Sequence, residues 1–557
     1  MNYLYYGDNI KILRYSYIKD ESVDLAYLDG PFKSDTDYNI LFKEKDGSKS
    51  ESQLLAFEDT WHWGEASEKA YEEVVERQGK PSLTLQFFRS LLGENDMMAF
   101  LCMMAPRLIE LKRVLKPTGL IVVHCDPTAG DFLKILLDSI FLPVNCRNEI
   151  IWKRTSNSGG PKSRSKQFAR NHDKILIYSK TNSFYSNKQF IPWTPEEIKI
   201  YFPRDENDGK GPYSWQALTY PSEEKIKELK EKNEFAEAGV GNKSKYHGYK
   251  VFLKNSKGRP IGSIWTDIES VSTGNSKEYR GFQTQKPEKL LERIIKFGCP
   301  PQGVVLDPFC GCGTAIIAAE TLQLNWIGID IGYGSIREIK DRLRETFGSN
   351  VQYELIGEPI SLPDAIELAK QDKHQFQWWA LDLVGARPIE KKGLNKKKGT
   401  GPDGGEDGVL YFQDELGGRV KKIIFSVKGG EEIGVGDIRD LIGTVDTKKA
   451  DLGVFISIKR RNENEKLFKN LSKVASMAGF YTSPDGIKLQ RIQVITVEEL
   501  LDGKRIGYQG TNVTFERKRP SSTVARQDVS KFVETSSIEN SDKEGFEEDT
   551  IGEDQIF

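Results

Sequence analysis

A glycine-rich stretch, residues 307–314 (DPFCGCGT), follows a short apolar run and precedes a segment that favours a helix. Several glycines in a turn permit positive φ and let a ligand approach the backbone closely, and the amides that begin the following helix favour polar groups. Asp330 ends the next apolar run, where a carboxylate suits two hydrogen bonds to ribose hydroxyls. A lone Gly-x-Gly turn is often only a tight turn, but this turn with its acidic partner favours a ribose-containing cofactor.

A second group of chemically capable residues follows the apolar run 23–28. Asp29, Gly30, Pro31 and Phe32 offer a carboxylate, a backbone carbonyl and an aromatic ring. An exocyclic amine on a nucleobase is a poor nucleophile because its lone pair is delocalised, so a catalyst must hold both amino hydrogens while the nitrogen becomes tetrahedral. Asp29 can accept one N–H, the carbonyl of Gly30 can accept the other, and Phe32 can stack on a base flipped out of a duplex.

Both groups resemble motifs of the S-adenosylmethionine-dependent DNA amino-methyltransferases. Residues 307–314 are similar to the DPFxGxGT cofactor motif, and residues 284–287 (TQKP) to the segment beside the methionine end of the cofactor. Residues 29–32 resemble the catalytic motif DPP(Y/F), in which a leading Asp is typical of adenine-N6 enzymes and Ser of cytosine-N4 enzymes. The resemblance implies that S-adenosyl-L-methionine is bound by Asp307, Pro308, Phe309, Gly311, Gly313, Thr314, Asp330, Gln285, Lys286 and Pro287.

The catalytic motif departs from the family at Gly30, where proline is expected. Proline fixes φ near −65°, whereas glycine leaves the loop free and the aim of the carbonyl less defined. A poorly aimed acceptor could slow methyl transfer by ~10²-fold, if it behaves like the loss of one preorganised donor. Natural drift toward low activity and a deliberate inactivating substitution both explain this glycine, and the sequence does not choose between them.

The order of the motifs is that of the β class of these enzymes, and the resemblance covers roughly residues 1–360. In that class the middle region recognises the DNA target, which implies this role for residues 151–280. The residues that we expect to contact DNA there are Lys153, Arg154, Lys162, Arg164, Lys166 and Arg170. A solvated basic insertion is the alternative for any one of them.

The C-terminal part places Asp407 before one apolar run and Lys428 at the end of the next. An acid that holds Mg²⁺ and a lysine that positions water are what metal-dependent phosphodiester cleavage needs, although such pairs also arise by chance. The pair resembles the D…(E/Q)xK core of Mrr-type restriction endonuclease domains, and Phe376-Gln377 resembles the Phe-Glu of their first helix.

Two positions of that core are altered, since Ser426 stands for Glu or Gln and Gln377 for Glu. A single carboxylate holds Mg²⁺ weakly, so Asp403 or Glu406 would have to assist Asp407. A nuclease-like domain that only binds DNA is therefore the alternative.

Apolar runs that alternate with amphipathic helices predict an α/β fold, with buried parallel strands where the runs are continuous. We expect a Rossmann-like methyltransferase with an inserted target recognition region, followed by a smaller α/β domain of the PD-(D/E)XK type with one long helix at 363–383. His124 ends one run and is interpreted as structural. The predicted domains are 1–150 (catalytic part), 151–280 (target recognition), 281–360 (cofactor-binding part), 361–510 (Mrr-like) and 511–557 (acidic tail).

Composition agrees with a multidomain protein that acts on DNA in the cytoplasm. The 557 residues carry a net charge of −2, yet residues 528–557 hold ten acids against two lysines, which leaves a net of +6 on the rest. That excess favours a polyanionic partner such as double-stranded DNA. The sequence predicts no membrane segment and leaves open whether the chain forms a homodimer.

The leading hypothesis is an adenine-N6 DNA methyltransferase, within a restriction-modification or phage-defence system. The alternatives are methylation of cytosine N4, a restriction or defence endonuclease whose methylase half mainly recognises DNA, and a DNA-binding module that senses the cofactor.

Overall fold

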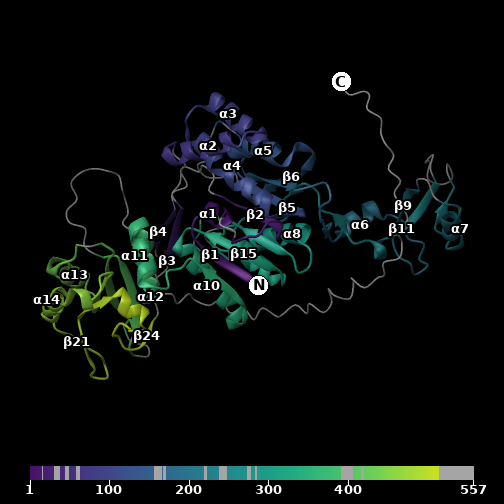
Figure 1. Cartoon of the computed structure of the whole chain (residues 1–557). Helices are drawn as coiled ribbons and strands as arrows, with labels where there is room; N and C mark the ends of the chain where they lie inside the picture. The colour runs from purple at the N-terminus through teal and green to yellow at the C-terminus, as the bar shows by residue number, and fades with distance from the viewer. Residues whose placement is uncertain are drawn as a thin grey trace. The chain divides into compact units, whose positions relative to one another are not determined.

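The computed structural model describes the chain except for residues 15–16, 31–37, 44–48, 58–62, 156–165, 167, 169–170, 219–221, 238–246, 272–277, 281, 283–284, 390–405, 416–418, 431 and 513–557. Residues Met1–Thr514 form one compact unit (Figure 1). Among the described residues, no helix combines the length and the apolar character that a membrane span requires.

A nine-stranded sheet organises the N-terminal part, in the order β13-β6-β7-β5-β2-β14-β15-β1-β16. The six strands from β5 to β16 run parallel, and β7 is antiparallel to both of its neighbours. The carboxyl ends of the parallel strands therefore meet at one edge of the sheet. The strands are β1 (Asn2–Tyr6), β2 (Val23–Leu28), β5 (Leu115–Cys125), β6 (Cys146–Lys153), β7 (His172–Ser179), β13 (Ile264–Trp265), β14 (Val304–Asp307), β15 (Asn325–Asp330) and β16 (Tyr353–Ile356).

Helices cover both faces of this sheet because alternate side chains of each strand point to opposite faces. Ala26 and Leu28 of β2 pack with α4 and α5, whereas Leu25 and Tyr27 pack in the core that contains α8, α9 and α10. Figure 1 shows α2 to α5 gathered together. The helices are α1 (Asn9–Arg14), α2 (Glu65–Glu76), α3 (Lys80–Leu92), α4 (Asp96–Val114), α5 (Pro127–Phe141), α8 (Glu288–Gly298), α9 (Thr314–Thr321) and α10 (Tyr333–Phe347).

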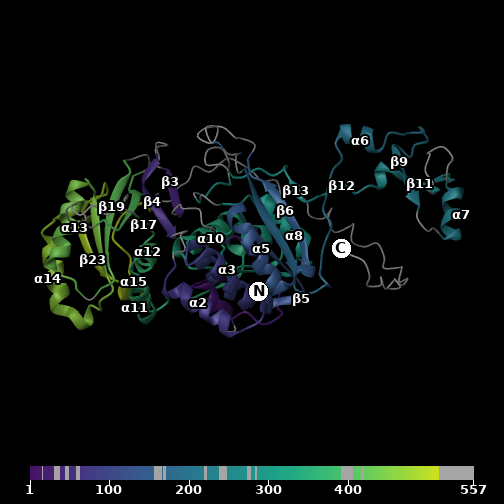
Figure 2. The ribbon, with the colours of Figure 1, turned by 90° about the horizontal axis from the view of Figure 1, so that it is seen from above.

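Part of the predicted target recognition range, residues 151–280, belongs to the central sheet. Strands β6 and β7 belong to the central sheet, because Ile175, Leu176 and Ile177 of β7 are buried in its two cores. Small elements follow and are grouped together in Figure 2. They are β8 (Phe190–Ile191), α6 (Pro195–Tyr201), β9 (Tyr213–Leu218), α7 (Glu223–Glu231), β10 (Phe235–Ala236), β11 (His247–Phe252) and β12 (Arg259–Pro260).

The C-terminal part has its own sheet, in the order β17-β18-β19-β20-β23, with α13 and α14 on one face and α11, α12 and α15 on the other (Figure 2). The predicted single helix 363–383 is two helices, because Asp372 has an extended backbone and its side chain caps α12. The elements are α11 (Leu362–Gln371), α12 (Lys373–Leu383), β17 (Arg387–Pro388), β18 (Gly408–Gln413), β19 (Lys421–Lys428), α13 (Val435–Thr447), β20 (Leu452–Ser457), α14 (Glu465–Ser476), β21 (Phe480–Thr482), β22 (Lys488–Gln490), β23 (Ile492–Thr496), α15 (Val497–Leu501) and β24 (Thr511–Asn512).

A separate hairpin pairs β3 (Tyr38–Lys43) with β4 (Lys49–Phe57).

The start of α10 packs directly against α12. The backbone N–H of Tyr333 donates to Gln375 at 2.9 Å, and its hydroxyl donates to Asp382 at 2.8 Å. Arg337 forms an ion pair with Asp382 at 3.0 Å. The ring of Tyr333 lies in the same apolar core as Phe376, so the two sheets share buried contacts across the predicted boundary near residue 360.

Candidate active site

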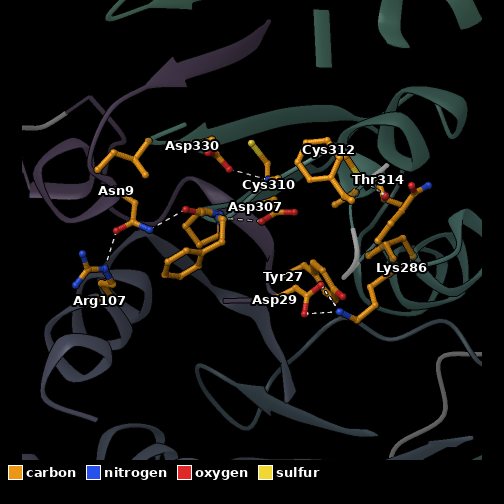
Figure 3. A pocket seen from close by; sticks show the side chains of 18 of the residues that line it. Asn9, Tyr27, Asp29, Arg107, Lys286, Asp307, Cys310, Cys312, Thr314 and Asp330 are labelled. Atoms are coloured by element: carbon orange, nitrogen blue, oxygen red, sulfur yellow. Dashed lines mark hydrogen bonds and ion pairs between the residues drawn. The ribbon is translucent and has the colours of Figure 1, made fainter. Parts of the chain in front are cut away.

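A pocket opens at the edge where the parallel strands β1, β2, β14 and β15 end (Figure 3). We call it the sheet-edge pocket. It lies where ligands bind in open α/β sheets, outside the carboxyl ends of the strands. Its polar or turn-forming lining residues are Asp8, Asn9, Tyr27, Asp29, Arg107, Gln285, Lys286, Asp307, Gly311, Thr314 and Asp330.

The predicted cofactor turn forms one wall of the pocket between β14 and α9. Gly311 and Gly313 have φ of 48° and 77°, in the left-handed region that favours glycine. A Cβ on Gly313 would lie 2.6 Å from Cγ1 of Ile339, so this glycine also allows α10 to pack closely. Pro308, Phe309 and Thr314 line the same wall.

Asp330 closes the pocket at the end of β15. Its two carboxylate oxygens accept backbone N–H groups from Gly311 at 2.8 Å and from Gly332 at 2.7 Å. Burial raises the pKa of Asp330 to about 6, against the lowering effect of these hydrogen bonds. A carboxylate has about four acceptor positions, so the backbone N–H groups leave acceptor capacity for ribose hydroxyls. The turn and this acid therefore fit the nucleoside part of S-adenosyl-L-methionine.

Asp29 reaches the same pocket from the end of β2, and its partner is Lys286. The Nζ atom of Lys286 donates to both carboxylate oxygens, at 2.8 Å to Oδ1 and 2.6 Å to Oδ2 (Figure 3). Gly30 does not have a left-handed backbone, and an added Cβ would meet only the ring of Phe309 at 3.6 Å, an ordinary contact. The geometry does not require glycine at this position. Pro31 and Phe32 lie outside the described residues.

The other predicted cofactor residues support the pocket in different ways. Gln285 is buried and bonds to the backbone of Glu278 and Arg280, so it organises the preceding loop. Pro287 is the N-cap residue of α8. Asp307 is fully buried, and burial together with the nearby charge of Asp29 raises its pKa well above the usual range.

A polar cluster that the sequence analysis did not predict lies opposite Asp29. The side chain of Asn9 donates to the backbone oxygen of Pro308 at 2.7 Å, and Arg107 donates to Asn9 at 2.7 Å (Figure 3). Arg107 also pairs with Asp8 at 3.1 Å. The available signal was Gly7-Asp8-Asn9 directly after the first strand, because polar residues at strand ends share the edge that holds the site.

His124 is buried within a chain of polar contacts beneath the pocket. It is 3.2 Å from the hydroxyl of Tyr27 and 3.0 Å from Asp173, which is 3.0 Å from Arg154. Burial raises the pKa of Asp173, but the hydrogen bond with His124 and the charges of Lys286 and Arg154 lower it below the usual range. These contacts connect Arg154, which follows β6 within the predicted target region, with Tyr27 in the pocket wall.

The predicted DNA-contact residues are only partly described. Lys153 ends β6, Arg154 contacts Asp173, and Lys166 is exposed. The remaining predicted positions, Lys162, Arg164 and Arg170, lie outside the described residues.

In the C-terminal part, Asp407 and Lys428 belong to neighbouring strand segments, as predicted. Oδ2 of Asp407 accepts the backbone N–H of Val427 at 2.7 Å, and Lys428 pairs with Asp437 of α13 at 3.2 Å. Ser426 is buried beside them.

The Mg²⁺ site expected at Asp407 stays a prediction. Within the part of the chain that the structure describes, no group of three His, Cys, Asp or Glu side chains is placed to hold a metal ion. Glu406 pairs with Lys422 at 3.0 Å, and Asp403 lies outside the described residues. No metal-dependent step is assigned to these side chains.

Several curated DNA methyltransferases are similar in sequence. The type II methyltransferase M.EcaI of Enterobacter cloacae is 26% identical over 305 residues, which cover 50% of this chain and 65% of that protein. The Mod subunit of the type III restriction-modification enzyme StyLTI of Salmonella typhimurium is 26% identical over 357 residues, 57% of this chain and 49% of that protein. The chain thus spans less than two thirds of each of these two relatives.

Solved structures that the chain matches include the M1.HpyAVI–SAM complex, with 15% identity, a TM-score of 0.30 and coverage of 62% of this chain and 99% of that one. Another is the cytosine-N4-specific PvuII DNA methyltransferase, with 14% identity, a TM-score of 0.31 and coverage of 63% and 87%.

Two family models match the chain. Residues 368–469 match one described as restriction endonuclease. Residues 23–341, more than half of the chain, match one described as DNA methylase. The strand order and the placement of Asp29 beside the cofactor turn agree with the match to the DNA methylase model. The chain belongs to the N6/N4 DNA methylase family.

Proposed function

We propose that this protein transfers a methyl group from S-adenosyl-L-methionine to the N6 amine of adenine in double-stranded DNA, in the cytoplasm. The observation that carries the proposal is that Asp29, Asp330 and the glycine turn line one pocket although they are far apart in sequence. The leading Asp of residues 29–32 favours adenine over cytosine, by resemblance to the family.

One group of residues binds the cofactor, and another binds the target amine. S-adenosyl-L-methionine supplies a methyl group bonded to a positively charged sulfur. Asp330 accepts the ribose hydroxyls, and the glycine turn admits the ligand close to the backbone. Asp29 and the carbonyl of Gly30 accept the two amine hydrogens, which localises the nitrogen lone pair. Bound S-adenosyl-L-methionine would supply the methyl group to that nitrogen, and the carboxylate of Asp29 would accept the proton that the amine loses.

Sequencing of single DNA molecules from cells that express the protein tests this function. We expect N6-methyladenine in one sequence context, and none in cells that express Asp29→Ala. Detection of N4-methylcytosine instead would show that the target is the N4 amine of cytosine. If DNA from cells expressing either the natural protein or Gly30→Pro carried no modified base, methylation as its function would be excluded.

The C-terminal part supports a second proposal, that it binds DNA beside the methylase within a restriction or defence system. Its match to restriction endonucleases supports DNA contact, while Ser426 and the ion pairing of Lys428 with Asp437 disfavour cleavage that depends on Mg²⁺. Incubation of the purified protein with duplex DNA and Mg²⁺, with and without the cofactor, distinguishes DNA binding alone from DNA cleavage. Cleavage that Lys428→Ala abolishes would establish the endonuclease instead.

A further inference from the structure

Lys286 belongs to a segment that the resemblance assigns to the cofactor, yet its charged group is directed at the catalytic carboxylate. Its Nζ atom contacts both oxygens of Asp29, at 2.8 and 2.6 Å. The side chains of Lys286 and Asp29 are only 13% and 18% exposed, so water competes weakly for this pair. The two residues lie 257 positions apart, and the contact joins the segment before α8 to the end of β2.

We infer that Lys286 is a positioning residue that fixes Asp29 for the target amine. The inference rests on the proposed function and deepens it. A carboxylate held at both oxygens cannot rotate freely about its last bond, whereas one attached to a glycine loop alone can. The lysine does not exhaust the acceptor capacity of Asp29, because about two of its four acceptor positions remain for an amine N–H.

The charge of Lys286 also suits this place. Asp29 and Asp307 line the pocket and Asp173 lies beneath it. The charge of Lys286 contributes to the lowered pKa of Asp173 and opposes the rise in the pKa of Asp307 that burial causes. One cation therefore serves a group of buried acids, and it lies closest to the one that the reaction needs.

Gly30 gives this contact added importance. In the family a proline at this place restricts the backbone next to the catalytic Asp, and here the side-chain contact supplies the restraint that the backbone lacks. The two restraints should partly replace one another. Removal of Lys286 should then cost less when residue 30 is proline.

The test compares Lys286→Ala, Lys286→Gln and Lys286→Arg, each with Gly30 and with Gly30→Pro. Lys289→Ala is the matched control, since Lys289 is an exposed lysine three residues further on, in the first turn of α8. Single-turnover methyl transfer at saturating cofactor should fall ~10²-fold for Lys286→Ala, as for a small misplacement of a reacting group. Lys286→Arg should retain most of the rate because a guanidinium also bonds to both oxygens. The affinity for S-adenosylhomocysteine, measured by calorimetry, should change little.

A full rate at saturating cofactor with a matching loss of affinity would show that Lys286 is a cofactor ligand, and would overturn the inference. If Lys286→Ala lowered the methyl-transfer rate equally with glycine and with proline at residue 30, the proline ring and the Lys286 contact would not replace one another. A double-mutant cycle of Lys286→Ala with Asp29→Ala on unfolding in urea reports on the ion pair without any activity. If the double-mutant cycle showed no coupling energy, the contact between Lys286 and Asp29 would be overturned. If coupling were present but no variant transferred methyl groups, the proposed function would be overturned and the contact would stand.

Discussion

Asp330 is a residue whose ionisation should control cofactor binding. Burial raises its pKa to about 6, so its carboxylate takes up a proton as the pH falls through that value. A protonated carboxyl is a poorer acceptor for two ribose hydroxyls than the charged form is. Calorimetry should therefore show an affinity for the cofactor that is nearly constant between pH 7 and 8. Below pH 6 it should fall by up to about tenfold for each unit.

The stability effect of Asp330 has the opposite sign. The folded state binds this proton more tightly than the unfolded chain does, where the pKa is about 3.9, so stability falls as the pH rises from about 4 to 6. Asp330→Asn is the control for the binding measurement, since it should bind cofactor weakly at every pH. Affinity in the natural protein that does not change between pH 5 and 7 would contradict the ribose role.

Gly30 is the residue at which this chain departs from its family, and the structure leaves space for a Cβ at this position. Gly30→Pro should raise the rate of methyl transfer, with little change in affinity for DNA, because the ring limits the backbone and aims the carbonyl. Gly30→Ala is the matched control, since it adds a Cβ in ordinary contact with Phe309 without closing a ring. A rate for Gly30→Pro that stays level or falls would mean that the loop has adapted to glycine.

At the scale of elements, the cofactor turn is held in place from α10 by a single buried arginine. Arg342 is 1% exposed and donates to the backbone oxygen of Cys312 at 2.6 Å and to Glu288 of α8 at 2.7 Å. It thus links the turn to both of its neighbouring helices.

Arg342→Leu should lower the free energy of unfolding by about 1–3 kcal/mol, because the buried oxygen of Cys312 loses its donor. It should also weaken cofactor binding, since the turn loses its support. Unfolding in urea and calorimetry provide the two measurements. The control is Arg344→Leu, which changes an exposed arginine of the same helix and should alter stability by less than about 0.5 kcal/mol. Equal effects of the two variants would contradict the role of Arg342.

The same elements explain how far sequence reasoning could go. Continuous apolar runs predicted β2, β14 and β15. Arg342 could not be predicted, because its helix has the alternating charges of a solvent-exposed surface. Arg107 was equally hidden, since its partner Asn9 lies 98 positions away in the sequence.

For the molecule as a whole, the contacts of Tyr333 and Arg337 with α12 connect the methylase part to the C-terminal part. Two variants distinguish the effect of these packing contacts from the effect of the second site. Lys428→Ala changes only the second site and should leave methyl transfer unchanged, as expected of distant sites. Asp382→Ala removes the acceptor shared by Tyr333 and Arg337, and should lower the melting temperature and weaken cofactor binding through α10.

Thermal unfolding followed with and without cofactor, beside methyl-transfer rates, measures both effects. If Lys428→Ala also slowed methylation, the boundary near residue 360 would have no functional meaning. If Asp382→Ala changed neither quantity, the contacts across that boundary would not support the cofactor site.

In the proposed reaction, Asp29 holds the target amine within the same pocket that binds the cofactor. The most direct measurement is the transfer of tritiated methyl groups to duplex DNA by the purified protein and by Asp29→Ala, followed by analysis of the labelled nucleoside. We predict label in N6-methyladenine, a loss of at least ~10²-fold in the variant, and cofactor affinity that is largely retained. Equal losses of turnover and cofactor affinity in Asp29→Ala, or unchanged turnover, would contradict the account.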